Sequence, residues 1–305
     1  MNDTYAVDPA APASTLEVSS LVRLFDVGEG RFIANFPVSW TEELKRSLIA
    51  QSDLGSILAE EAKRRLQHAL LPLRAPYVPS RRWMENAAAI AGRVRMVIGG
   101  ADCGPIGVPL AEVLAALDGL PDSSGGYIRM VPAEYARIAA PLFQTSPTVC
   151  LVDKYFRLRR RSGRGWVRDQ RSSVLKELLA RAGAEGKTEL IRLTVSREHA
   201  LEDDPTGRAF MEAANSLAEE VGNRVSRIEY ALLEDLAQTH SHGRYLLGVN
   251  SGMHVDHGFA VKVSAVNHVH WLRRAELNPL LDHFMRAPVR RQAVAARACL
   301  PVIRR

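Results

Sequence analysis

The sequence predicts an α/β protein, because apolar strands and amphipathic helices alternate along its second half. Strands are predicted over 148–152, 188–195 and 228–232, and helices over 172–182 and from Thr206 onward. Strands joined through a helix lie parallel with a right-handed crossover, so this order predicts a mostly parallel sheet flanked by helices. The strand over 148–152 is the most continuously apolar and should be central in that sheet.

Composition divides the 305 residues into four segments. Residues 1–15 are rich in Ala, Pro, Asp and Thr, and we predict a disordered lead-in there. Residues 16–126 are predicted to form a small mixed α+β region that ends at the flexible turn Pro121–Gly126. The main α/β domain is expected over 127–285, and 286–305 form a basic C-terminal tail without an acidic residue.

The N-terminal region is predicted to begin with two strands, over 20–27 and 31–38. A capping box at Ser39–Glu42 then starts a helical segment. After a proline-rich stretch, the pattern predicts a helix over 80–91 and a short buried strand over 93–98. This order of elements gives the region its mixed character.

The charge balance favours anionic partners. Lys and Arg number 40 against 34 Asp and Glu, a net charge of +6, and most of the basic residues are Arg, which binds phosphate and carboxylate well. The three cysteines, Cys103, Cys150 and Cys299, are too few and too far apart for a disulfide framework or a zinc knuckle. With no signal peptide and no apolar run near the roughly 20 residues of a membrane span, we expect a cytoplasmic protein.

An arginine-rich segment follows the central strand. It contains Trp166, two glycines and, as its only acidic residue, Asp169. Its arginines are Arg157, Arg159, Arg160, Arg161, Arg164, Arg168 and Arg171. We predict a mobile basic loop that grips phosphates, with the aromatic side chain available for stacking, and the alternative is a solvated surface loop. The tail at 286–305, after a helix predicted over 271–285, is a second basic segment.

A His-x-Arg pair precedes a predicted β-hairpin. The apolar run 245–249 and the tight turn after it form the hairpin, which carries His242 and Arg244 at its open end. Asp153 and Tyr155 follow the central strand, at the edge where open α/β sheets bind ligands. We therefore predict one cleft, in which Asp153 pairs with Arg244 or orients His242 to hold an anion. The alternative is an exposed edge strand with unrelated polar residues.

About half of the chain, roughly 128–285, resembles the phospholipase D-like superfamily. The resemblance is carried by the apolar strand ending in Asp153-Lys-Tyr155, by two helix-and-strand units, and by His242-Gly-Arg244-Tyr with its glycine-rich hairpin. Within the superfamily, the chain is most similar to the degenerate branch typified by the C-terminal domain of microtubule-interacting-and-transport (MIT) proteins and to bacterial relatives of that branch. The resemblance implies a sheet between helices and a site for phosphate or phosphodiester groups.

The sequence departs from the catalytic pattern of that superfamily. Active members supply two His-x-Lys elements per site: one His attacks phosphorus, the other protonates the leaving group, and the Lys residues hold the phosphate oxygens. Here one such element occurs, with Arg244 in place of Lys, and Val249 stands where the family has Asp. The resemblance thus implies no complete active site in a monomer. His242 and Arg244 are catalytic candidates only if a homodimer supplies the second histidine.

The sequence predicts neither a metal site nor a cofactor. Residue types that bind zinc or manganese gather at His254, Asp256, His257, His268 and His270. Their spacing matches no known ligand motif, although His254 and Asp256 share a strand face, and a half-exposed hairpin explains them. The Gly-x-Gly sequences at Gly28 and Gly163 lack the third glycine and the strand-to-helix setting of a dinucleotide fingerprint.

Together, the residues and the resemblance predict a non-catalytic module that recognises phosphate or phosphodiester groups through Asp153, Tyr155, His242, Arg244 and the arginine-rich segment. Nucleic acid is the expected ligand, within a bacterial multi-component system such as genome defence, in a homodimer or beside a partner protein. The first alternative is a phosphodiesterase or nuclease completed by homodimerisation. The second is binding to an anionic membrane surface, with which the amphipathic stretch 289–303 is consistent.

Overall fold

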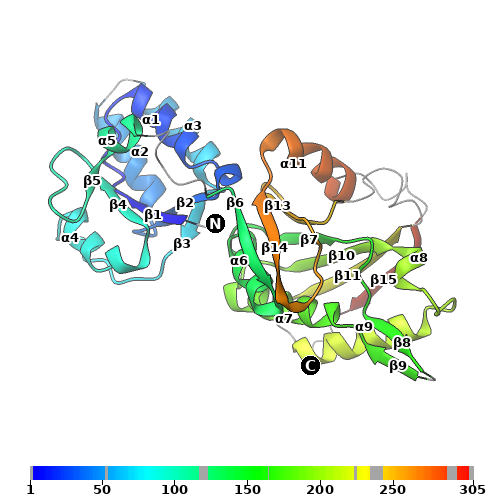
Figure 1. Ribbon diagram of the computed structural model, residues 1–305. Helices are drawn as coiled ribbons and strands as arrows, with labels where there is room; N and C mark the ends of the chain where they lie inside the picture. The colour runs from blue at the N-terminus through cyan, green and yellow to red at the C-terminus, as the bar shows by residue number, and fades with distance from the viewer. Residues whose placement is uncertain are drawn as a thin grey trace. The chain divides into compact units, whose positions relative to one another are not determined.

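The computed structural model describes residues 3–51, 54–116, 123–163, 165–222, 225–233 and 243–286, and the backbone of 294–301. The chain divides into two compact units, Met1–Ser124 (unit 1) and Gly125–Arg305 (unit 2), inside the turn predicted at 121–126. Both units combine a sheet with helices, which confirms the predicted α/β class (Figure 1). Within the described residues, no helix is long and apolar enough to cross a membrane.

Unit 1 is built on a parallel sheet with the strand order β3-β2-β1-β4-β5. The strands are β1 (Asp3–Val7), β2 (Arg31–Asn35), β3 (Leu70–Pro72), β4 (Met96–Gly99) and β5 (Val108–Pro109). The predicted disordered lead-in over 1–15 is wrong, because β1 is the middle strand. Tyr5, Ala6 and Val7 are buried in the sheet, and the Ala and Pro residues that follow outweigh this short strand in the composition.

The predicted strand over 20–27 is also wrong, because helix α1 (Thr15–Leu24) occupies most of it. The Ser14 side chain accepts a hydrogen bond of 3.2 Å from the backbone N–H of Glu17 and so caps the first turn. Val18, Leu21 and Leu24 are buried at helical spacing. The cap and this spacing decide for a helix over the β-prone composition of the segment.

Helices cover both faces of the unit 1 sheet. After α1, they are α2 (Trp40–Gln51), α3 (Gly55–Leu66), α4 (Trp83–Ala88) and α5 (Leu110–Ala115), with short 3₁₀ turns η1 (Val27–Glu29) and η2 (Ala91–Arg93). One buried cluster joins Tyr5 and Val7 of β1 to α1, α2, α3 and α5. A second cluster joins Ala6, from the opposite face of β1, to Trp83 of α4. Unit 1 is thus a three-layer α/β/α arrangement.

Unit 2 contains a mixed sheet with the order β15-β11-β10-β7-β12-β13-β14-β6. The strands are β6 (Gly125–Met130), β7 (Thr148–Val152), β10 (Leu190–Ser196), β11 (Arg227–Leu233), β12 (Tyr245–Gly248), β13 (Gly252–Val255), β14 (Lys262–Trp271) and β15 (Val294–Pro301). The central place of β7 is confirmed. The mostly parallel sheet is corrected: β7, β10 and β11 are parallel, whereas every other pairing is antiparallel.

Helices flank this sheet on both sides (Figure 1). They are α6 (Pro132–Thr145), α7 (Arg171–Glu185), α8 (Arg197–Ala200), α9 (Arg208–Val221) and α11 (Arg274–Leu281), which continues into the π turn η5 (Asp282–Arg286). Cys150 and Val152 of β7 pack with the leucines of α11 in one buried cluster. The helix predicted over 271–285 starts later than expected, because Trp271 ends β14.

Part of the predicted basic tail belongs to the sheet. Residues 294–301 form β15, which pairs antiparallel with β11 at the edge. The backbone of this stretch is therefore a strand, and the separate tail expected over 286–305 is corrected for these residues.

Candidate functional site

The carboxyl end of β7 positions Asp153. The side chain is almost completely buried, with the residue 1% exposed. Its Oδ1 accepts a hydrogen bond from the Tyr155 N–H (3.0 Å) and its Oδ2 accepts one from the Phe259 N–H (3.2 Å). Burial raises the pKa of Asp153, and the two N–H groups and the charges of Arg171 and Arg244 oppose that rise. Asp153 is thus a buried acid whose carboxylate is fixed by two backbone N–H groups.

Arg244 lies beside Asp153, because β12 pairs directly with β7. Its Nε is 4.0 Å from Asp153 Oδ1, and its Nη1 donates a 2.8 Å hydrogen bond to the carbonyl oxygen of Asp256. The guanidinium carbon lies 5.3 Å from the centre of the Tyr155 ring, within cation–π range. The structure therefore brings Asp153, Tyr155 and Arg244 together. His242 lies outside the described residues.

Tyr155 is surrounded by side chains of this unit. The Lys154 Nζ lies 4.7 Å from the ring centre, and the His199 ring lies 4.7 Å away at an interplanar angle of 46°. Arg244 also lies near the ring, so two cationic side chains and one imidazole are close to Tyr155. We interpret Tyr155 as a residue that positions cations rather than as a platform for a ligand base.

A loop from β13 to β14 closes over Asp153. Gly258 has φ +64°, and a Cβ at this position would lie 2.6 Å from Asp153 Oδ2, so only glycine fits without a shift. Asn267 Nδ2 donates to the Gly258 carbonyl (2.8 Å), and the Tyr135 hydroxyl donates to the Ala260 carbonyl (2.9 Å). These bonds hold the loop against the end of β7, where Asp153 lies beside Arg244.

The arginine-rich segment forms an antiparallel ribbon of two strands, β8 (Arg159–Ser162) and β9 (Gly165–Arg168), where a mobile basic loop was predicted. Ion pairs join Arg157 to Glu202, Arg159 to Glu212, Arg168 to Glu220 and Arg171 to Asp169. Three of these acids come from 202–220, outside the segment, and Arg168 and Lys176 lower the pKa of Glu220 to about 2. Asp169 is the only acidic residue within the segment, as counted in the sequence, but acids from outside the segment neutralise three more of its arginines.

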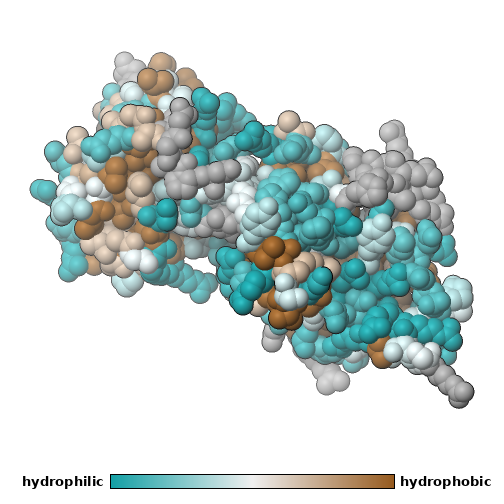
Figure 2. Space-filling view, in the orientation of Figure 1, coloured by the Kyte–Doolittle hydropathy of each residue, from teal (hydrophilic) through white to brown (hydrophobic). Residues whose placement is uncertain are grey.

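Two arginines of the ribbon differ from the others. Arg160 and Arg161 are exposed and form no ion pair with any acidic residue that the structure describes. Figure 2 shows mainly hydrophilic side chains at the end of unit 2 that carries β8 and β9. Arg164 lies outside the described residues. The uncompensated positive charge of the described ribbon is thus concentrated at two neighbouring positions of β8.

A small hollow of about 230 Å³ adjoins the ribbon. Its lining residues are Arg160, Asp169, Gln170, Arg171, Ala260 and Val261. Two guanidinium groups face one carboxylate there, and the N-terminus of α7 adds positive potential. An anionic oxygen such as that of a phosphate would be favoured in this hollow, because guanidinium groups offer paired donors to it.

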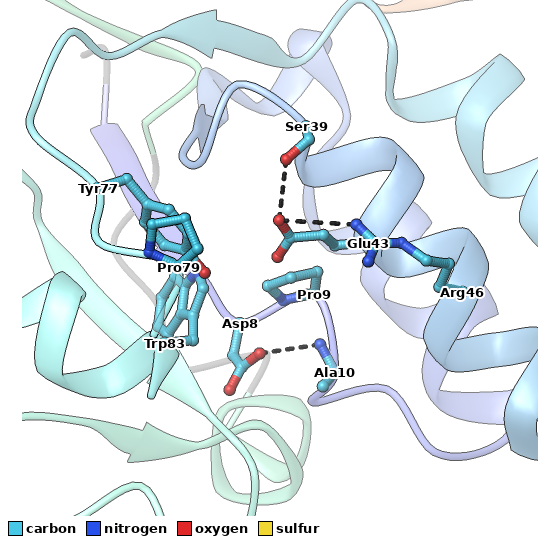
Figure 3. A pocket seen from close by; sticks show the side chains of 9 residues that line it. All are labelled: Asp8, Pro9, Ala10, Ser39, Glu43, Arg46, Tyr77, Pro79 and Trp83. Atoms are coloured by element: carbon cyan, nitrogen blue, oxygen red, sulfur yellow. Dashed lines mark hydrogen bonds and ion pairs between the residues drawn. The ribbon is translucent and has the colours of Figure 1, made fainter. Parts of the chain in front are cut away.

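Unit 1 has its own hollow, of about 580 Å³, beyond the carboxyl end of β1. It is lined by Asp8, Pro9, Ala10, Ser39, Glu43, Arg46, Tyr77, Pro79 and Trp83. Figure 3 shows Tyr77, Pro79 and Trp83 on one side and Glu43 and Arg46 on the other. Burial, and then the charge of Glu43, raises the pKa of Asp8. With two carboxylates and one guanidinium, this lining disfavours a phosphate group.

The structure also assembles residues from which the sequence analysis predicted no metal site. His254, Asp256, His268 and His270 lie together on β13, β14 and the loop after β13. Burial and the neighbouring His270 lower the pKa of His254, whereas Asp256 opposes this change. The alternation His-x-Asp and His-x-His on consecutive strands was the signal in the sequence.

These features define unit 2 as an α/β domain with a buried acid–arginine pair and a basic ribbon. No protein-family model matches the chain, and no curated protein does. Similar solved structures include the archaeal chromatin protein TrmBL2, which shows a novel mode of DNA binding, with a TM-score of 0.29 and 11% identity over 61% of this chain and 60% of that one. Another is polyphosphate kinase from Porphyromonas gingivalis, with a TM-score of 0.32 and 14% identity over 57% of this chain and 29% of that one. At such values we draw neither fold nor function from them.

Proposed function

We propose that unit 2 is a non-catalytic module that binds the phosphate groups of nucleic acid, and that Arg160 and Arg161 supply the main contacts with Arg171 beside them. The observation that carries this proposal is the pair of neighbouring exposed arginines on β8 that form no ion pair with a described acidic residue. One of them, Arg160, lines the hollow at the start of α7. Backbone binding scales with the number of phosphates that a protein neutralises. An arginine already paired with a glutamate contributes less to it.

The proposal concerns binding and not turnover because of the residues available for in-line displacement. The phospholipase D-like reaction needs one imidazole that attacks phosphorus and a second that protonates the leaving group from the opposite side. The sequence has a single His-x-Arg element, at His242. Arg244 is engaged with Asp153 and Asp256, so its guanidinium supports the fold around the carboxyl end of β7.

The test measures how nucleic-acid affinity depends on salt. Binding of a fluorescent DNA duplex is titrated at several salt concentrations for the wild type, for Arg160→Ser/Arg161→Ser, and for the control Arg157→Ser/Arg159→Ser. Both double variants remove two positive charges from the same segment, but the control removes arginines that glutamates already neutralise. Each lost phosphate contact should reduce the slope of log affinity against log salt by about 0.9.

We expect a slope reduced by about 1.8 for Arg160→Ser/Arg161→Ser and little change for the control. Equal slopes for the two double variants would contradict the assignment, since affinity would then follow net charge alone. Binding to vesicles with anionic lipid but not to DNA would favour a membrane surface instead. Circular dichroism of each variant shows whether the fold is kept.

A further inference from the structure

Four side chains with metal-binding chemistry share one face of the unit 2 sheet. His254 on β13 is directly opposite His270 on β14 in the antiparallel register. Asp256 and His268 lie two positions away along their own chains, and alternate residues of a strand point to the same face. The register thus gathers three imidazoles and one carboxylate from two neighbouring segments.

The distances are short enough for one ion. The candidate ligand atoms of His254, Asp256 and His270 all lie within 4.8 Å of one another. His254 Nδ1 is 3.0 Å from Asp256 Oδ1, and His268 Nδ1 is 3.4 Å from Asp256 Oδ2. The rings of His254 and His270 are 5.0 Å apart. In tetrahedral zinc sites, ligand atoms about 2.0–2.1 Å from the metal lie about 3.3 Å apart, so small side-chain rotations would close this group around an ion.

Two of the imidazole nitrogens lack the partner that burial demands. The Nδ1 atoms of His254 and His270 are buried and make no hydrogen bond within the described residues. His254 Nδ1 approaches the Asp256 carboxylate, but without the alignment of a hydrogen bond. A buried polar atom without a partner costs free energy, and such atoms in a folded protein indicate an absent ligand or water. Here both unpartnered atoms belong to the same three-residue group.

We propose that His254, His270 and Asp256 bind one divalent transition-metal ion, with Zn²⁺ as the expected ion. Imidazole nitrogen with carboxylate oxygen is a zinc-type ligand set, whereas Mg²⁺ and Ca²⁺ take oxygen ligands. His268 supports the site through Asp256, because its Nδ1 lies 3.4 Å from the second oxygen of that carboxylate, and neighbours of this kind orient a metal ligand. Three protein ligands leave a fourth position open for water or an anionic oxygen.

Asp256 links the site to the pair of Asp153 and Arg244. Arg244 donates a hydrogen bond to the main-chain carbonyl of Asp256, and the side-chain oxygens of Asp256 face the imidazoles. Metal binding would therefore hold Asp256 in place, and Asp256 is also the residue that accepts the hydrogen bond from Arg244. The metal proposal stands on the histidine geometry alone and does not depend on nucleic-acid binding.

The experiment uses the full chain without a purification tag, stripped of metal and titrated with Zn²⁺ against a chromophoric chelator, with bound zinc counted by elemental analysis. We expect one zinc ion per chain. His254→Ala and His270→Ala should each weaken zinc binding by about 100-fold or more, and His268→Ala by about 10- to 100-fold. The control His257→Ala removes an exposed histidine next to the site and should bind zinc like the wild type.

A second measurement separates loss of the site from loss of the fold. Zinc at about 100 times its Kd should lower the unfolding equilibrium constant of the wild type and of His257→Ala by about 100-fold, and that of His254→Ala much less. Hydrogen exchange of β13 and β14 without metal shows whether each variant is folded. The proposal is overturned if folded wild-type protein binds no zinc, if His254→Ala and His257→Ala bind it equally, or if Mg²⁺ competes with Zn²⁺ at equal concentration.

Discussion

Replacing Arg244 by Ala should destabilise unit 2 by about 1.5 to 3 kcal/mol. The substitution removes a charged hydrogen bond of 2.8 Å to the Asp256 carbonyl, and a hydrogen bond of this type contributes about 1.5 to 3 kcal/mol. The substitution also leaves Asp153, whose side chain is 2% exposed, without the guanidinium that lies 4.0 Å away. An exposed ion pair would contribute only about 0 to 1 kcal/mol. The opening free energy from hydrogen exchange of the β7 and β12 amides measures the loss, and Arg244→Lys is the control that keeps the charge.

The pH dependence separates the two contributions. Arg244 lowers the pKa of Asp153, which burial raises, so the variant should raise that pKa further above its unfolded value. A carboxyl whose folded pKa is raised destabilises the protein above that pKa and costs nothing below the unfolded value of about 3.9. The loss of unfolding free energy in Arg244→Ala should therefore shrink as the pH falls from 8 to 4. The part that remains at pH 4 is the contribution of the hydrogen bond to Asp256. A deficit below about 0.5 kcal/mol, or one equal at both pH values, would refute the pairing.

Three further outcomes are expected. Gly258→Ala should destabilise the protein by at least about 2 kcal/mol, because it combines a left-handed backbone with a clash against Asp153 Oδ2. The control Gly186→Ala, with φ +75° and nothing near its Cβ, should cost only about 1 kcal/mol. Urea unfolding compares the two variants, and equal costs would exclude the clash. Asp8→Asn should stabilise unit 1 at pH 7 but not at pH 3, because the raised pKa makes the charged form unfavourable above the unfolded value; thermal unfolding at both pH values checks the sign. Cys150, whose pKa burial raises to about 11, should resist iodoacetamide at pH 8 until the protein unfolds, and rapid labelling of the native protein would contradict this.

Strands with a continuous apolar run could be predicted from the sequence, and strands with fewer apolar residues could not. Thr148–Val152 is apolar along its length, and its central place followed from the need to bury both faces. Asp3–Val7 is equally central in its sheet, but only three of its residues are buried and the neighbouring segment is rich in Ala and Pro. Its place depends on pairing with Arg31–Asn35 and Met96–Gly99, contacts that no local pattern displays.

The same distinction holds for the candidate site. The proximity of Asp153 and Arg244 was predictable, because a strand end and an adjacent hairpin determine it. The opposition of His254 and His270 was not, because it requires the register of two strands, and a shift of one residue would turn one imidazole to the other face.

Charge along the arginine-rich segment shows the physical limit of such predictions most directly. The sequence counts seven arginines against one acid in 157–171, yet glutamates folded in from 202–220 neutralise three of those arginines. Charge counted along a segment therefore overestimates the charge that a ligand meets. Ion pairs with distant acids remove their arginines from the salt-dependent part of binding, which is why Arg160 and Arg161, rather than the whole segment, should determine the slope.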